Sequence, residues 1–242
     1  MIVKLIAHTV VTGWGDMRDT GWVDYPEEID GETWDAFENF ADADYLAEFA
    51  GRLCYQSWER PNPATATNVG YLANILDVKH TSVLEHSSAT FLVREVSRSL
   101  LDELRTHRHL SFSALSQRYV DSSNPIIVTP PAIVEDFKVR GNTTQLLLDA
   151  ATDHAIGTYR ELVERLTTAG LPRKQAREAA RSVLPMATET QFVVTGNMWA
   201  WHYVLGRRVA ASADAEMQLV AKEMLRQLKE IAPNTFQDMK DE

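Results

Sequence analysis

The sequence contains very little cysteine. Only Cys54 among the 242 residues is a cysteine, which excludes a disulfide within the chain and a cysteine-rich zinc site. A protein without disulfides is typical of a reducing compartment, so we expect it in the cytoplasm. Cys54 lies in a helical pattern with no histidine beside it in sequence, and we expect its thiol to be buried and unreactive.

Long apolar runs and the common nucleotide-binding motifs are also missing. No stretch approaches the roughly 18 apolar residues of a membrane span. Residues 1–8 lack the long apolar core of a secretory leader, so we expect no association with a membrane. Neither a glycine-rich dinucleotide fingerprint nor a P-loop is present, and a bound nucleotide would therefore need another kind of site.

Positive charge is scarce relative to negative charge. The chain has 24 lysines and arginines against 34 acidic residues, which gives a formal net charge of −10. Such a field does not attract nucleic acid or an anionic membrane surface, and we expect neither as a partner. An anionic ligand would have to be held by a local basic cluster.

Hydrophobic periodicity predicts a mainly helical chain with a few strands. Helices are expected over residues 44–55, 67–79, 97–107, 143–169, 173–183, 198–208 and 213–231. Strands are expected at residues 2–11, 88–96, 116–120 and 190–195. Because these strands do not alternate with helices in a βαβ rhythm, we expect an α+β fold, with a small, mostly antiparallel sheet flanked by long helices.

Residues 13–44 differ in composition from the rest. They carry four glycines, one proline, many acidic residues and three tryptophans. We expect an irregular acidic insertion within a single domain that spans residues 1–242. The tryptophans argue against full disorder and are most simply explained as anchors of a surface loop.

The clearest basic cluster is the segment RTHRHLSFSALSQRY, residues 105–119, which follows a helical pattern. Cations at the end of a helix are favourable for its dipole, and this explains the cations and imidazoles at the start of the segment. It does not explain the serines or Arg118. Guanidinium forks match phosphate oxygens and serine hydroxyls complete such a cradle, so the segment predicts a site for a phosphorylated ligand.

Histidines and a glutamate gather at His80, Glu85 and His86. They fit a metal site, a cofactor contact or simple capping of the next strand. The two histidines are six residues apart, which is not the i,i+4 spacing of a helical zinc motif. Asn197 follows a predicted strand, and its role as a helix N-cap is a sufficient explanation.

Arginines recur every four residues at Arg173, Arg177 and Arg181. Most such stripes are solvated surface with partial salt pairing. If unpaired, the guanidinium groups repel one another and a nearby anion would relieve them. Arg208, at the end of another predicted helix, signals nothing by itself.

Taken together, these patterns resemble the flavin-dependent thymidylate synthases. The resemblance rests on the family's signature, an Arg-His-Arg triplet followed after seven residues by Ser and then by Arg-Tyr. Its counterparts here are residues 106–108, Ser116 and residues 118–119. Further landmarks stand in family order at residues 51–55, 80–86, 180–185, 196–197 and Arg208. The stretch 110–119 is most similar to the actinobacterial branch.

The resemblance implies a reaction and an assembly. Methylenetetrahydrofolate would give a one-carbon unit to dUMP, and FAD reduced by NADPH would supply the hydride that completes the methyl group of dTMP. The family forms homotetramers whose active sites combine residues of several subunits, with FAD bound between subunits. One alternative is a nucleotide- and flavin-binding relative with weak or no turnover. Another is a metal hydrolase that uses His80, Glu85, His86 and His107.

The resemblance also assigns roles to individual residues. Flavin contacts are implied for His80, Ser82, Glu85, Thr106, His107, Arg108, Ala114, Asn197 and Tyr203. Nucleotide contacts are implied for Glu103, Thr106, Ala114, Leu115, Ser116, Gln117, Arg118, Arg181 and Arg208. Arg208 is the expected catalytic residue, since a guanidinium beside the pyrimidine carbonyls stabilises developing negative charge. No metal ligand is assigned, and Ser116 is interpreted as a phosphate or sugar ligand rather than a nucleophile.

The chain departs from the family pattern at three positions. Thr106 replaces the first arginine of the signature, and Arg105 stands one residue early, about 100° away around a helix. Trp199 replaces another arginine but retains a ring that can stack on a flavin or an adenine. Asp214 replaces a common glutamine. The changes at Thr106 and Trp199 are the reason to consider a nucleotide- and flavin-binding relative with weak or no turnover.

Overall fold

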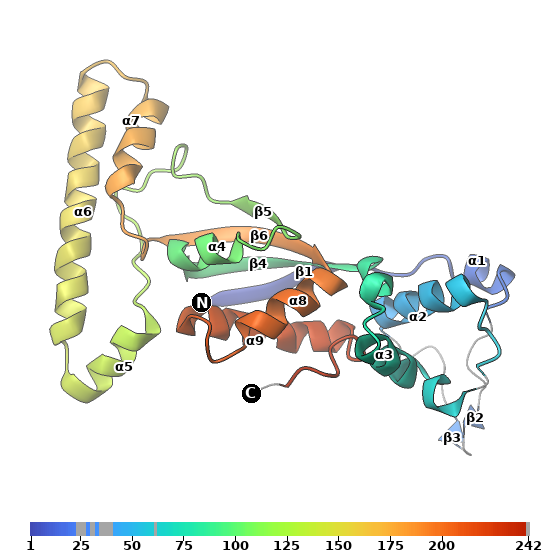
Figure 1. The fold of residues 1–242 in the computed structure, drawn as a ribbon. Helices are drawn as coiled ribbons and strands as arrows, with labels where there is room; N and C mark the ends of the chain where they lie inside the picture. The colour runs from blue at the N-terminus through green and yellow to red at the C-terminus, as the bar shows by residue number, and fades with distance from the viewer. Residues whose placement is uncertain (23–27, 30–31, 34–40, 61, 241–242) are drawn as a thin grey trace.

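A small antiparallel sheet forms the centre of the molecule. The computed structural model describes residues 1–22, 28–29, 32–33, 41–60 and 62–240. Within these residues the sheet has the order β1-β4-β6-β5, with every neighbouring pair antiparallel. Its strands are β1 (Ile2–His8), β4 (Ser88–Ser97), β5 (Ser111–Ala114) and β6 (Glu189–Asn197). The expected α+β class and the antiparallel sheet are confirmed (Figure 1).

Helices account for most of the remaining described chain. The α-helices are α1 (Trp14–Asp19), α2 (Asp42–Tyr55), α3 (Asn68–Asp77), α4 (Arg98–Leu104), α5 (Pro131–Arg140), α6 (Thr143–Thr168), α7 (Arg173–Ala180), α8 (Met198–Arg208) and α9 (Ala215–Ile231). Short 3₁₀ turns are η1 (Pro63–Thr65), η2 (Thr81–Glu85) and η3 (Arg181–Val183). All seven expected helices are present, whereas α1 and α5 were not expected. None of the helices in the described part of the chain is long and apolar enough to cross a membrane.

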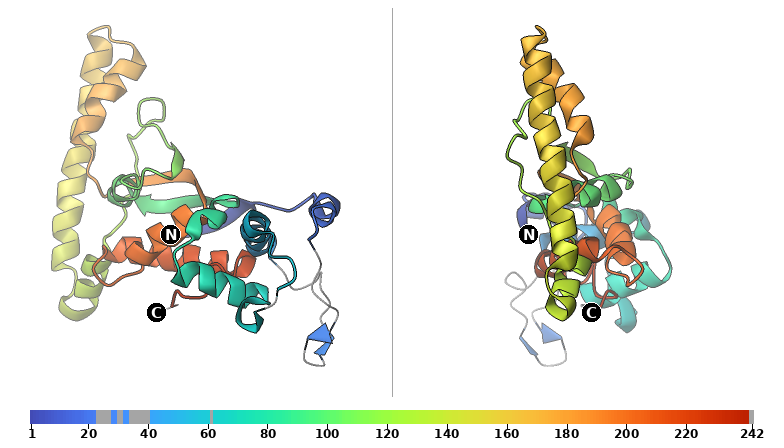
Figure 2. Two further views of the ribbon diagram at one scale, coloured as in Figure 1. Left: turned by 45° about the vertical axis from the view of Figure 1, so that its right-hand side comes forward. Right: turned by 90° about the vertical axis from the view of Figure 1, so that its left-hand side faces the viewer.

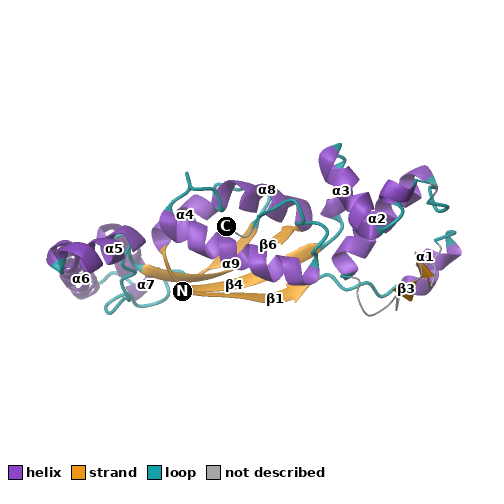
Figure 3. Ribbon diagram, turned by 90° about the horizontal axis from the view of Figure 1, so that it is seen from below, coloured by secondary structure: helices purple, strands orange, loops and turns teal. Residues whose placement is uncertain are grey.

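The main core lies between one face of the sheet and the helices α4, α8 and α9, which cover it in Figure 3. Along β6, and along β4 as far as Val93, every second side chain is buried, as expected for strands with one covered face. Phe91 and Phe192 are buried on this face, and Trp201 of α8 packs edge-on against Phe91 at 5.2 Å. Because α8 begins directly after β6, this packing fixes where its side chains stand.

The helices α6 and α7 stand side by side at one end of the sheet, while α2 and α3 lie at the other end (Figures 1 and 2). Thr152, Ile156 and Tyr159 form the buried stripe of α6. Leu147, nearer the start of the helix, is 73% exposed. The Tyr159 hydroxyl accepts a hydrogen bond from the Ser122 N–H at 3.3 Å and so ties the segment after β5 to α6.

One expectation fails next to β5. The strand expected at residues 116–120 is a turn, in which the N–H groups of Tyr119 and Val120 both bond to the Ser116 carbonyl. The strand is instead β5, whose Ser-Phe-Ser-Ala alternation pairs with β6. Residues 196–197 are the last part of β6, and Asn197 caps α8 as predicted.

The expectation for Cys54 was also wrong, because its side chain is exposed. The buried side of α2 includes Ala47, Glu48 and Arg52, and the last turn of the helix leaves Cys54 outside. Arg52 donates to Glu48 at 2.6 Å. The buried side of α2 therefore includes an ion pair but not the thiol.

The acidic insertion at residues 13–44 is described in part. It contains α1 and the paired two-residue strands β2 (Glu28–Ile29) and β3 (Glu32–Thr33), while residues 23–27, 30–31 and 34–40 lie outside the described residues. Trp22 is buried and packs against Tyr45, Phe49 and Trp58 at ring distances of 5.1 to 5.8 Å. The expected role of a tryptophan as an anchor is confirmed for Trp22.

Candidate functional site

The end of α8 meets the end of α4 around the Arg208 guanidinium. Its Nη1 donates to the Glu103 carboxylate, and its Nε donates to His107 Nε2 at 2.8 Å. Its Nη2 lies 3.5 Å from Thr106 Oγ1. The structure thus brings Arg208 to three other predicted site residues that are 101 to 105 positions before it in the sequence. Charge-assisted hydrogen bonds on several sides hold this guanidinium in one orientation.

His107 is held in its neutral form. Burial lowers the pKa of its imidazole, and the positive charges of Arg208 and Arg207 lower this pKa further. Since Nε2 accepts a hydrogen bond from the Arg208 Nε–H, the proton of the neutral ring is on Nδ1. A neutral imidazole can accept from a guanidinium, whereas a charged one would repel it.

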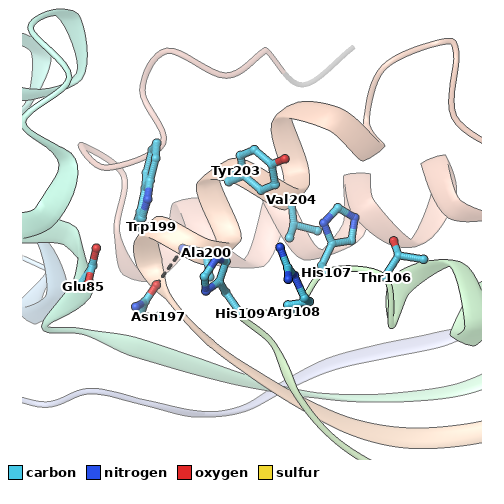
Figure 4. Close-up of a pocket in the computed structure, with 10 residues that line it drawn as sticks. All are labelled: Glu85, Thr106, His107, Arg108, His109, Asn197, Trp199, Ala200, Tyr203 and Val204. Atoms are coloured by element: carbon cyan, nitrogen blue, oxygen red, sulfur yellow. Dashed lines mark hydrogen bonds between the residues drawn. The ribbon is translucent and has the colours of Figure 1, made fainter.

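A pocket of about 480 Å³ opens beside this cluster. Its lining residues are Glu85, Thr106, His107, Arg108, His109, Asn197, Trp199, Ala200, Tyr203 and Val204 (Figure 4). They come from η2, from the segment after α4 and from the first turns of α8. The Asn197 side chain accepts from the Ala200 N–H at 2.7 Å and so fixes the start of α8.

The donor set of this pocket fits a flavin nucleotide. Arg108 supplies a permanent positive charge for a phosphate, and His107 and His109 add imidazole groups. Trp199 and Tyr203 add aromatic surface for a planar ring, and Figure 4 shows both projecting from the same side of α8. The combination of cations and rings is what a nucleotide cofactor requires.

His80 and Ser82, two other predicted flavin residues, line a second hollow of about 410 Å³. Glu85 lines both hollows, so η2 contributes to each of them. Eight of the nine predicted flavin residues are thus divided between two adjoining hollows, whereas Ala114 lines neither of them. Among the residues that the structure describes, no group of three His, Cys, Asp or Glu side chains is placed to hold a metal ion. The metal-hydrolase alternative gains no support there.

The predicted nucleotide-binding stretch, residues 114–118, begins beside the middle of β6, where Ala114 pairs with Phe192, and leads toward α7. Arg118 is 3.8 Å from Glu178. Arg177 donates to the Tyr119 carbonyl at 2.7 Å and to Asp121 at 2.8 Å. None of the residues Ser116, Arg118 and Arg181 lines the pocket beside Arg208. In one chain the predicted substrate residues therefore form two separate groups.

Arg98, which the sequence analysis did not single out, lies next to the second group, beside Arg105 and Arg181. Burial lowers the pKa of Arg98, and Arg105 and Arg181 lower it further, while Asp102 opposes them. Arg98 Nη1 is buried without a hydrogen-bond partner, as is Nε2 of Gln117. Donors left unpaired in this way are costly unless a ligand accepts from them. The i, i+4, i+7 spacing of Arg98, Asp102 and Arg105, which places them on one face of a helix, was the signal in the sequence.

Comparison with known proteins identifies the family. Residues 37–234 match the family described as thymidylate synthase complementing protein. The chain is 50% identical over its whole length to a probable flavin-dependent thymidylate synthase of Mycobacterium phage L5, and covers 98% of that protein. It is 51% identical to the corresponding protein of phage D29, with 100% of this chain and 97% of the relative aligned.

Cellular relatives match a shorter part of the chain. The flavin-dependent thymidylate synthase of Mycobacterium tuberculosis is 50% identical over 200 residues, which cover 80% of this chain and 78% of the relative. Identity of this extent, together with a family match over most of the sequence, is decisive. The chain belongs to the flavin-dependent thymidylate synthase family.

Proposed function

We propose that this protein converts dUMP to dTMP, with methylenetetrahydrofolate as the carbon donor and FAD reduced by NADPH as the hydride source. The observation that carries the proposal is the Arg208 guanidinium, fixed by Glu103 and His107 at the edge of a pocket of cations and aromatic rings. Membership of the flavin-dependent thymidylate synthase family supports it.

The flavin would be held by His107, Arg108, Asn197 and Tyr203, with His80, Ser82 and Glu85 from the adjoining hollow. When bound and reduced, this cofactor supplies the hydride that completes the methyl group. The protein's own contribution is to bind the ring and the phosphates and to orient them. The hydrogen bond from Arg207 to the Tyr203 hydroxyl, at 2.8 Å, keeps that phenol in place.

Arg208 would act on the pyrimidine. Uracil must become electron-rich at C5 before it can attack the one-carbon unit, and negative charge then grows on its carbonyl oxygens. A guanidinium held in advance by Glu103 and His107 stabilises that charge without reorganising. His107 is already bonded to Arg208 through Nε2, so this nitrogen is not available as a base for Ser116. This supports Ser116 as a ligand rather than a nucleophile.

A homotetramer would bring the two groups of predicted substrate residues together. The pocket beside Arg208 is not lined by Ser116, Arg118 or Arg181, and Arg118 instead lies beside Glu178 of α7. Apolar side chains on α5 and α6 are exposed in the single chain, namely Val134, Phe137, Val139, Leu146 and Leu147. Such a patch is typical of a surface that is covered in an oligomer. We infer that each active site combines residues of several subunits.

The test is dTMP formation from dUMP and methylenetetrahydrofolate with NADPH, with and without added FAD. We expect product that depends on FAD. Flavin that binds and is reduced by NADPH without any dTMP would instead support a relative without turnover, and would point to Thr106 and Trp199 as the cause. A folded protein that binds no flavin would contradict the whole proposal.

A further inference from the structure

A row of aromatic rings runs from the core to the wall of the pocket. Trp199, in the first turn of α8, lines the pocket. Its ring is stacked on His202 at 5.7 Å with an interplanar angle of 23°, and His202 is stacked on Phe236 at 6.0 Å and 25°. Phe236 is fully buried. The indole at the pocket is therefore backed by rings that are anchored in the core.

The middle ring is fixed by the segment that follows α9. His202 Nε2 lies 3.0 and 3.2 Å from the two carboxylate oxygens of Asp238. That segment is itself held, because Lys229 donates to the Met239 carbonyl at 2.7 Å. The family match ends at residue 234, so Asp238 lies beyond it. The orientation of Trp199 thus depends on residues outside the matched region.

An indole held in this way is suited to bind another planar ring. Trp199 is partly exposed, and the same pocket supplies Arg108 and Asn197 as polar partners. A ring fixed before binding loses little conformational entropy when a ligand stacks on it. Stacking of a base on an aromatic side chain is worth roughly 1–3 kcal/mol by alanine substitution.

We propose that Trp199 binds a fused aromatic ring of the flavin nucleotide by stacking, and that His202 and Asp238 are positioning residues for its indole. The inference rests on the proposed function, because it takes FAD as the ligand. FAD carries two fused ring systems, isoalloxazine and adenine, and the chemistry of stacking is common to both. The experiment distinguishes them.

The first test compares the dissociation constants of FAD and FMN for the intact protein and for Trp199→Ala and Trp199→Phe. We expect Trp199→Ala to bind FAD about 5- to 150-fold more weakly, and Trp199→Phe to recover most of the loss. Equal losses for FAD and FMN, with loss of flavin fluorescence quenching, would identify the isoalloxazine. A loss for FAD alone would identify the adenine.

The control is Leu219→Ala, which removes an exposed side chain on α9 outside the pocket. Unchanged FAD affinity in a folded Trp199→Ala protein would overturn the inference while leaving the proposed function intact. If the intact protein binds no FAD, the proposed function itself fails. The two failures are therefore distinguishable.

The second test is a double-mutant cycle between Asp238 and Trp199. We expect Asp238→Ala to weaken FAD binding less than Trp199→Ala does, and to have no further effect in the Trp199→Ala background. Asp238→Asn should restore most of the affinity and quenching, because the amide oxygen still accepts from the imidazole N–H. A loss of the same size in both backgrounds, or no loss in either, would show that Asp238 does not act through Trp199.

Discussion

Two groups of arginines in this chain are in opposite electrostatic states. Arg208 is bonded to Glu103 and to the neutral His107, so its charge is balanced and its orientation is fixed. Arg98 has Arg105 and Arg181 as neighbours, opposed only in part by Asp102, and its Nη1 is buried without a hydrogen-bond partner. The first group is organised before any ligand arrives. In the second, a bound anion would supply the missing partner of Arg98, which suits a residue that holds a phosphate rather than one that stabilises a reacting ring.

The largest expected effect is at the organised group. Arg208→Ala should lower the rate of the chemical step by about 10²- to 10³-fold, the usual result of removing a donor at the site of developing charge. Single-turnover dTMP formation measures this step. Ser116→Ala should retain activity, with its effect confined to the KM for dUMP. Equal losses of rate in the two variants would contradict the assigned roles.

At Arg98, we expect a substitution to change the affinity for dUMP rather than the rate of the chemical step. Arg98→Ala should weaken dUMP binding by roughly 10- to 150-fold, because a charge-assisted hydrogen bond to the phosphate is lost. Titration calorimetry with dUMP and with deoxyuridine separates the phosphate from the base. The matched control is Arg94→Ala, which removes an exposed arginine of β4. If Arg98→Ala weakens deoxyuridine as much as dUMP, the phosphate is not its partner.

A second guanidinium beside Arg208 would place two positive charges close together, as they already are around Arg98. Thr106 Oγ1 is 3.5 Å from Arg208 Nη2, so Thr106→Arg should tighten dUMP binding roughly tenfold. It should also lower the free energy of unfolding of the ligand-free protein, because two like charges then lie close together. Calorimetry and denaturant unfolding measure the two effects. Thr106→Gln is the uncharged control, and equal dUMP affinities in the two variants would refute the idea.

The smallest expected effect comes from protonation of His107, which is hydrogen-bonded to Arg208. Burial and the arginines lower the pKa of this imidazole below its ordinary value of 6.5 in the folded protein. Between the two pKa values the unfolded chain binds more protons, so stability is lost as the pH falls below 6.5. Arg208 then also loses its acceptor, and we expect a few-fold loss of rate in the pH profile. His107→Gln should flatten this acidic limb, and an unchanged limb would exclude His107 as its cause.

The sequence predicted those features that depend on local pattern. The helix α8, Met198–Arg208, was predicted to its exact bounds because its apolar period and its Asn197 cap are local signals. The strand β5 was misplaced because a four-residue alternation is too short to outweigh its neighbours. The ion pair between Arg208 and Glu103 joins residues 105 positions apart. It depends on how β4 and β6 pair, and no local pattern carries that information.

The resemblance to a family supplied residues, but not their grouping. It placed Arg181 and Arg208 together as nucleotide contacts, whereas one chain holds them in separate groups. It also gave no reason to notice Arg98 or His202, whose importance follows from an unpaired buried donor and from a stack of rings. Such features arise only when distant helices pack, so they are visible only in three dimensions.

Because Cys54 is exposed, the protein can be labelled at a single site without mutagenesis. Cys54 is the sole thiol of the chain, and it lines the hollow that contains His80 and Ser82. A thiol-reactive fluorophore would therefore attach at one defined point, without any cysteine having to be introduced or removed. Its emission would follow events in the neighbourhood of η2, and two labelled chains would report by energy transfer on how subunits come together.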